Sequence, residues 1–127
     1  GYSLEAYKNA TQLKAEALAL MSKATEPYAR HANEVETLNT RIDAAYEFAR
    51  GRPLDDISSR QWAIMRSPER DLYGGFMRDW RAHGTLGSAF VAAKKAQVGT
   101  GFDYIVCLEA NRKTAARTCV AAPEMAS

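Results

Sequence analysis

The sequence predicts an all-α fold, an antiparallel bundle of three long helices with two short helices between the second and the third. In three long segments, apolar residues return every three or four positions, which is the period of an α-helix. The first segment also consists largely of strong helix formers and contains neither glycine nor proline. Only residues 102–107 favour a strand, and no second such run is present to pair with them.

The length of 127 residues is typical of one domain. We assign residues 1–117 to the helical bundle. Residues 118–127, rich in alanine and interrupted by Pro123, are expected to form an extended or frayed tail.

The first predicted helix runs from Ser3, which can serve as its N-cap, to Ala24. Its apolar residues share one face of the helix: Ala6, Ala10, Leu13, Ala17, Leu20 and Ala24. Because most of them are alanines, a neighbouring helix can approach this face closely. That neighbour could also belong to a second copy of the chain, so self-assembly is one hypothesis for the function.

The second predicted helix, Tyr28 to Arg50, has a face with the same spacing: Tyr28, Ala32, Val35, Leu38, Ile42, Ala45 and Ala49. Thr25 can cap it, and Pro27 suits its first turn. Gly51, placed before Pro53, is expected to end it in the left-handed conformation. One long helix kinked at Pro27 is the alternative. We favour two antiparallel helices because a hairpin buries both apolar faces.

The two short helices are predicted at Ile57 to Met65 and at Leu72 to Trp80. Asp56 or Ser58 can cap the first. For the second, Ser67 is expected as the N-cap and Pro68 as the first helical residue.

Gly74 and Gly75 fall inside the second short helix. Each glycine in a helix costs about 1 kcal/mol relative to alanine. We therefore expect close packing or a local break at this point.

The third long helix is predicted from Leu86 to about Ala115, with Arg112 and Lys113 in its last turn. Its apolar residues lie near helical spacing: Leu86, Phe90, Ala93, Val98, Phe102, Ile105 and Leu108. The segment Gly99-Thr100-Gly101 is a point at which it could split.

The two cysteines, Cys107 and Cys119, form a disulfide or remain two buried thiols. On one continuous helix they would lie about 18 Å apart, whereas a bridge needs Cα atoms within about 7 Å. A disulfide therefore requires the chain to reverse after about Ala115.

Several classes of function lack the residues they need. The net charge of +2 and the pI near 8.6 are too low to predict nucleic-acid binding. No apolar run is long enough to span a membrane. Glu-x-x-His pairs, paired zinc ligands and phosphate-binding glycine loops do not occur in the sequence, so we expect no metal or other cofactor.

Catalytic candidates are equally sparse, and we expect no enzymatic activity. His31 precedes Glu34, and His83 follows Asp79 by four residues. We interpret both as helical ion pairs or caps. The adjacent carboxylates Asp55 and Asp56 are interpreted as caps rather than as an acid/base pair.

One segment combines the aromatic and guanidinium groups that dominate binding hot spots. The candidate partner-binding residues are Trp62, Arg66, Arg70, Tyr73, Phe76 and Trp80. In the alternative interpretation, which we favour, Trp62, Phe76 and Trp80 close one end of the bundle and arginine stems cover them.

Three groups of residues resemble parts of small, uncharacterised helical bacterial envelope proteins of the lipoprotein type. They are Gln61-Trp62, residues 72–76 with Trp80, and residues 102–105 with Leu108-Glu109. The resemblance implies a periplasmic protein, or a membrane-anchored one facing the periplasm, with a lipid anchor upstream of Gly1. A cytoplasmic location is the alternative.

The function we expect is therefore that of a non-enzymatic envelope protein with a structural or partner-binding role. Its partner would be an unknown protein or envelope component. The alternatives are self-assembly, and a small-ligand carrier or enzyme with a pocket around Gly74 and Gly75, which needs a concave site of several hundred Å³ with convergent polar groups.

Overall fold

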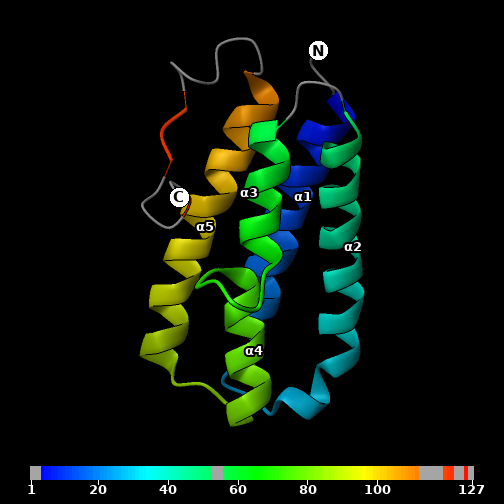
Figure 1. The fold of residues 1–127 in the computed structure, drawn as a ribbon. Helices are drawn as coiled ribbons and strands as arrows, with labels where there is room; N and C mark the ends of the chain where they lie inside the picture. Colours follow the sequence, from blue (N-terminus) through cyan, green and yellow to red (C-terminus); the bar gives the residue numbers. More distant parts are fainter. Residues whose placement is uncertain (1–3, 53–55, 112–118, 122–124, 126–127) are drawn as a thin grey trace.

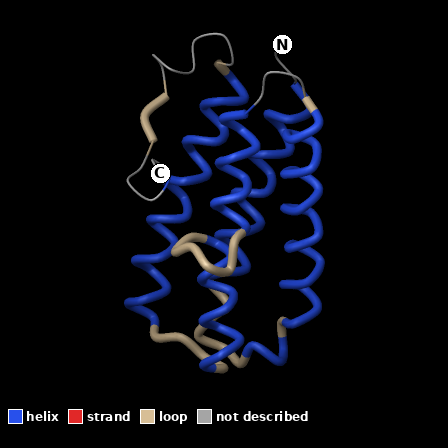
Figure 2. The backbone as a smooth tube through the Cα atoms, viewed as in Figure 1, coloured by secondary structure: helices blue, strands red, loops and turns tan. Residues whose placement is uncertain are grey.

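The computed structural model describes residues 4–52, 56–111, 119–121 and 125 (Figure 1). The helices are α1 (Leu4–Met21), α2 (Ala32–Gly51), α3 (Asp56–Arg66), α4 (Tyr73–His83) and α5 (Ser88–Ala110), with a 3-10 turn, η1, at Tyr28–Arg30. Figure 2 shows that helices and loops account for all of these described residues, without a strand. The prediction of an all-α fold is confirmed.

The helices form four roughly parallel columns (Figure 1). α1 runs down from the N-terminus, α2 returns upwards, α3 and α4 descend one after the other, and α5 returns upwards. α1 packs against α5 and α2, while α3 packs against α2 and α5. The two short helices therefore form a column of their own.

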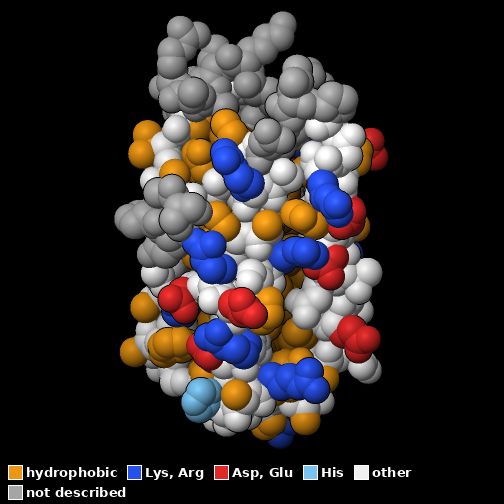
Figure 3. Space-filling view, in the orientation of Figure 1, with side chains coloured by type: hydrophobic (Ala, Val, Ile, Leu, Met, Phe, Trp, Pro, Cys, Tyr) orange, Lys and Arg blue, Asp and Glu red, His pale blue; other side chains and the backbone are white. Residues whose placement is uncertain are grey.

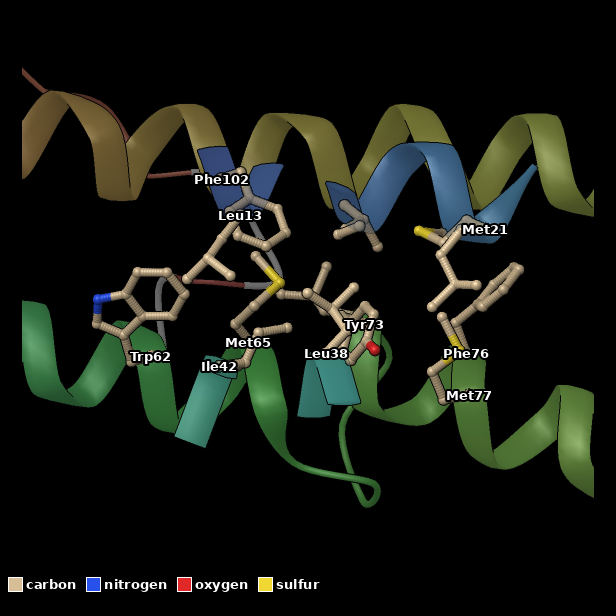
Figure 4. Packing of buried hydrophobic residues seen from close by; sticks show 14 of the residues in the cluster. Leu13, Met21, Leu38, Ile42, Trp62, Met65, Tyr73, Phe76, Met77 and Phe102 are labelled. Atoms are coloured by element: carbon tan, nitrogen blue, oxygen red, sulfur yellow. The ribbon is translucent and has the colours of Figure 1, made fainter. Parts of the chain in front are cut away.

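The core lies between these columns and contains the apolar faces predicted for the first two long helices. Leu13 from α1, Ile42 from α2 and Phe102 from α5 are completely buried. They surround Trp62 and Met65 of α3 (Figure 4). In α5 the predicted face is buried only from Val98 onward. Phe90, in the first turn, is 41% exposed and stacks on Phe76 at the bundle surface.

α1 and α2 are separate antiparallel helices, as favoured from the sequence over one helix kinked at Pro27, but their connection is longer than predicted (Figure 1). α1 ends at Met21, η1 follows Pro27, and α2 begins only at Ala32. The backbone here is hydrogen-bonded to the α4–α5 connection, because Tyr28 N donates to Gly84 O at 2.7 Å and Leu86 N donates to Ala24 O at 2.8 Å. These tertiary bonds satisfy groups that a continuous helix would have paired internally. Thr25 therefore does not cap α2.

The predicted range of the second short helix, Leu72 to Trp80, begins within one residue of α4, but its predicted N-cap is wrong. α4 begins at Tyr73 with Leu72 as its N-cap, and Ser67 instead accepts a hydrogen bond from Glu69 N within a turn. The 67–72 turn lies directly on the first turn of α4. A Cβ atom on Gly74 would come within 2.2 Å of Arg66 O, and one on Gly75 within 1.9 Å of Arg70 O. The expected close packing at these glycines is confirmed.

Two predicted helix ends are also corrected. Gly51 is the last residue of α2 and is not left-handed; the left-handed glycine is Gly84, which ends α4 with a φ of 81°. Ser58 lies inside α3 and donates a side-chain hydrogen bond instead of capping the helix. Ser3, Pro53 and Asp55 lie outside the described residues.

α5 is continuous through Gly99 and Gly101 and ends at Ala110, not near Ala115. Asn111 ends it by donating from its backbone N and its side-chain Nδ2 to Cys107 O, at 3.0 and 3.1 Å. The residues predicted for its last turn, Arg112 and Lys113, lie outside the described part of the chain.

The chain reverses beyond α5, and a disulfide joins Cys107 to Cys119 with their Cα atoms 5.8 Å apart. The described part of the tail is attached to the bundle at two points. Besides the disulfide, Met125 is 1% exposed and lies in the core beside Gly101. These positions are therefore not frayed.

Candidate functional site

A groove of about 950 Å³ separates α2 from α4. Each helix lines it with residues spaced for a single face: Val35, Asn39, Ile42 and Asp43 from α2, and Gly74, Met77, Arg78, Arg81 and Ala82 from α4. In Figure 3, apolar side chains are visible between basic ones in the lower half of the molecule, where α4 and α2 face the viewer. The groove therefore combines an apolar floor with a charged rim.

The turn after α3 closes one end of the groove, and Tyr28 lines it near the C-terminal end of α4. Ala63, Arg66, Ser67 and Pro68 contribute at the α3–α4 end. Because Gly74 and Gly75 bring α4 against this turn, the helix is fixed along the α3 column. That placement leaves the face of α4 toward α2 uncovered.

Two of the three groove arginines are held by partners in the chain. Arg66 Nη1 lies 3.1 Å from Asp43 Oδ1, and its guanidinium stacks 4.0 Å above the centre of the Tyr46 ring. Arg78 donates to Asp79 through Nε and Nη2, and to the carbonyl oxygen of Pro68 through Nη1.

The third, Arg81, is exposed. No carboxylate of the described residues forms an ion pair with it. Its positive charge is therefore uncompensated within that part of the chain.

Tyr73 connects the two walls at the floor of the groove. Its hydroxyl donates to Asn39 Oδ1 at 2.8 Å, and its ring is buried in the core (Figure 4). Burial raises the pKa of this phenol, so it remains a neutral donor across the physiological range. Tyr73 is a structural tie between α4 and α2.

The aromatic residues singled out in the sequence are in the core. Trp62, Tyr73, Phe76 and Trp80 are all at most 3% exposed. They are core residues, and Trp80 also lies against the α1–α2 connection at one end of the bundle (Figure 1), beside Tyr28 and His31. Trp80 Nε1 donates to Glu26 O at 3.0 Å, and Trp62 meets Phe102 edge to face.

Of the candidate partner-binding residues, only Arg66 and Arg70 reach the surface, where both are half-buried. Arg66 lines the groove. The sequence analysis overlooked Asn39, Asp43, Arg78 and Arg81. Their helical spacing could have indicated two polar faces, but not that the faces oppose each other.

The alanine face of α1 is covered by the chain itself. Ala10 and Ala17 have no exposed surface, and neither has Ala24, which follows the helix. α5 and α2 pack against this helix. A second copy of the chain would have to displace them to use the same face.

The two histidines take part in local hydrogen bonds. His31 donates to Glu34 Oε1 at 2.9 Å and to Glu26 Oε1 at 2.7 Å, and Lys23 also pairs with Glu34. The bonds to Glu34 and then Glu26 raise the pKa of His31. His83 Nδ1 donates to the carbonyl oxygen of Asp79 at 2.8 Å, not to its carboxylate as an ion pair would require.

A buried carboxylate, overlooked in the sequence, joins α5 to α3. Glu109 is 1% exposed and accepts hydrogen bonds from Ser58 Oγ at 2.9 Å and from Arg52 Nη2 at 3.0 Å. A charge with so little exposure is tolerated because these donors replace water. We interpret this cluster as structural.

Within the described ranges, no group of three or more histidine, cysteine or acidic side chains is arranged to hold a metal ion. The same residues contain no helix with the length and apolar character of a membrane span. Comparison of the chain with family models, curated proteins and solved structures finds no match.

Proposed function

We propose that this protein is a non-enzymatic binding protein whose ligand lies in the groove between α2 and α4. The observation that carries the proposal is the groove itself: its volume of about 950 Å³ is that of a small-molecule site. Its lining also follows the usual pattern of such sites, an apolar surface with a few polar groups that fix orientation.

The ionisable groups of the groove favour binding over catalysis. Catalytic acids and bases usually have a pKa near the working pH. The groove instead has arginines, which remain protonated, and Asp43, which is paired with Arg66. Neither histidine lines it.

We further propose that the protein works in an oxidising compartment such as the bacterial periplasm. The Cys107–Cys119 disulfide supports this location because structural disulfides are rare in the cytosol. Alkylation of thiols during lysis of the native cells, followed by mass spectrometry, measures the state of both cysteines. We expect neither to be labelled; labelling of both would contradict the proposed compartment.

The scaffold we propose for this role is an antiparallel bundle of three long helices, with the two short helices between the second and the third. The short helices supply one wall of the groove, and the second long helix supplies the other.

Binding can be tested with two fluorescent dyes, neutral N-phenylnaphthylamine and anionic anilinonaphthalene sulfonate. Both brighten when they leave water for an apolar site. We expect at least one to bind the folded protein with a Kd on the order of 10 μM. Binding of neither dye at that concentration would contradict the proposal.

A plugging variant locates the bound dye. Ala82→Phe adds a ring at the rim of the groove, and Ala92→Phe adds the same ring on the exposed face of α5. We expect the first to weaken binding about tenfold and the second to leave it unchanged. Equal effects of both variants would place the dye elsewhere.

A further inference from the structure

One arginine of the groove, Arg81, forms no ion pair with a carboxylate of the described residues, and it lies in the last turn of α4. Arg66 and Arg78 also line the groove, but Asp43 pairs with Arg66 and Asp79 pairs with Arg78. Arg78 Nη1 also donates to Pro68 O at the α3–α4 end. The positive charge that remains for a ligand is therefore at the C-terminal end of α4.

We infer that the ligand is a small anionic amphiphile, with its carboxylate, sulfonate or phosphate group at Arg81. This inference rests on the proposed function and names the chemical class of the ligand. The planar guanidinium of Arg81 can donate two parallel charged hydrogen bonds to one oxyanion.

The apolar part of the ligand would lie along the floor of the groove. Val35 and Ile42 line the α2 wall, and Met77 lines the α4 wall. Methionine adapts its shape to different apolar partners, which suits a site for a flexible or aromatic body. The groove thus provides for both halves of an amphiphile, whereas a free inorganic anion would use only Arg81.

Arg81 also has a structural role that an experiment must separate from binding. It lies in the last turn of α4, where a cation is stabilised by the partial negative charge of the helix terminus. Its replacement is therefore expected to lower stability slightly whether or not a ligand binds. The affinity for a neutral dye separates the two effects, because a neutral dye does not interact with the charge of Arg81.

The anionic and neutral dyes named above have the same aromatic skeleton and differ by one sulfonate. We expect the wild-type protein to bind the anionic dye about tenfold more tightly than the neutral dye. Arg81→Gln should remove most of this preference and leave the affinity for the neutral dye unchanged. Inorganic phosphate at about 10 mM should not displace the anionic dye, because it lacks the apolar part.

Arg60→Gln is the matched control, since it removes the same charge from an exposed position on α3 that does not line the groove. It should leave the preference intact. Equal binding of both dyes by the wild type would refute the anionic class and leave the groove as a binding site, whereas binding of neither refutes the proposed function itself. A loss of preference in Arg60→Gln as large as in Arg81→Gln would show a general effect of net charge. Displacement of the anionic dye by phosphate would show that the site binds simple anions. That result would contradict the proposal of an amphiphilic ligand.

Discussion

The contact between α1 and α5 is closed, while the facing sides of α2 and α4 remain apart. Along α1, the small residues Ala10 and Ala17 are buried, and Leu18 packs beside Gly99 of α5. An ion pair between Lys14 and Asp103 joins the same two helices at the surface. Helix backbones approach closely where small residues meet at the contact.

α4 also contains small residues, but they are used in a different direction. Gly74 and Gly75 face the backbone of the preceding turn, so they bring α4 against the end of α3 instead of against α2. The groove between α2 and α4 is spanned by the hydrogen bond from Tyr73 to Asn39 and is otherwise open. Which helices pack closely therefore depends on the direction in which the small residues face.

The largest expected effect on stability comes from a comparison of two ion pairs, one buried and one at the groove. Glu109→Ala removes the buried carboxylate that joins α5 to α3 away from the groove and leaves Arg52 and Ser58 without it, so we expect a loss of about 4 kcal/mol in the free energy of unfolding. Asp43→Ala breaks the exposed pair with Arg66 at the groove and should cost less than about 1 kcal/mol. Urea unfolding measures both. Similar losses would show that the two regions are equally desolvated.

Gly74→Ala tests whether the glycines set the position of α4. The added methyl would overlap Arg66 O, a backbone atom that cannot move alone, and we expect a destabilisation of about 3 kcal/mol with a change in dye binding. Gly51→Ala is the control, because nothing lies within 4 Å of its Cβ position, and it should be neutral or stabilising by up to about 1 kcal/mol. A stabilised Gly74→Ala protein would contradict the described packing.

Removal of the disulfide tests a part of the molecule that lies away from the groove. The double variant Cys107→Ala with Cys119→Ala frees a short loop, and we expect it to lose about 2 to 3 kcal/mol of stability. Dye affinity should not change, because neither cysteine lines the groove. Thermal unfolding and dye titration on the same sample provide both readings, and a coupled loss of affinity would argue against two independent regions.

The smallest effect depends on pH and concerns the α1–α2 connection, which leads into the groove wall. Because Glu34 and Glu26 raise the pKa of His31 above 6.5 in the folded state, protonated His31 stabilises the fold. That contribution is complete below about pH 6.5 and is lost as the pH rises through the folded-state pKa.

His31→Gln is the corresponding variant. At about pH 5.5 this variant should unfold at a lower urea concentration than the wild type. At about pH 8.5 the two unfolding midpoints should be nearly equal. A difference that is constant or grows with pH would contradict the assigned pairs.

The sequence alone determined the helical class, because the three-to-four-residue period depends only on local geometry. It also identified the buried faces of α1 and α2 and the need for close packing at Gly74 and Gly75. The side chains of Trp62, Phe76 and Trp80 could be interpreted as core or surface from composition, and only the assembled columns placed them inside.

Tertiary structure decided everything that depends on distant partners. The break before α2 follows from backbone bonds to Gly84 and Leu86, and the burial of Glu109 follows from Arg52, which is 57 positions away. The groove has the same origin, since its two walls are helical faces that no local pattern relates. The helical period shows which side of a helix is apolar. The packing of the whole chain decides which neighbour covers that side, or whether it stays open.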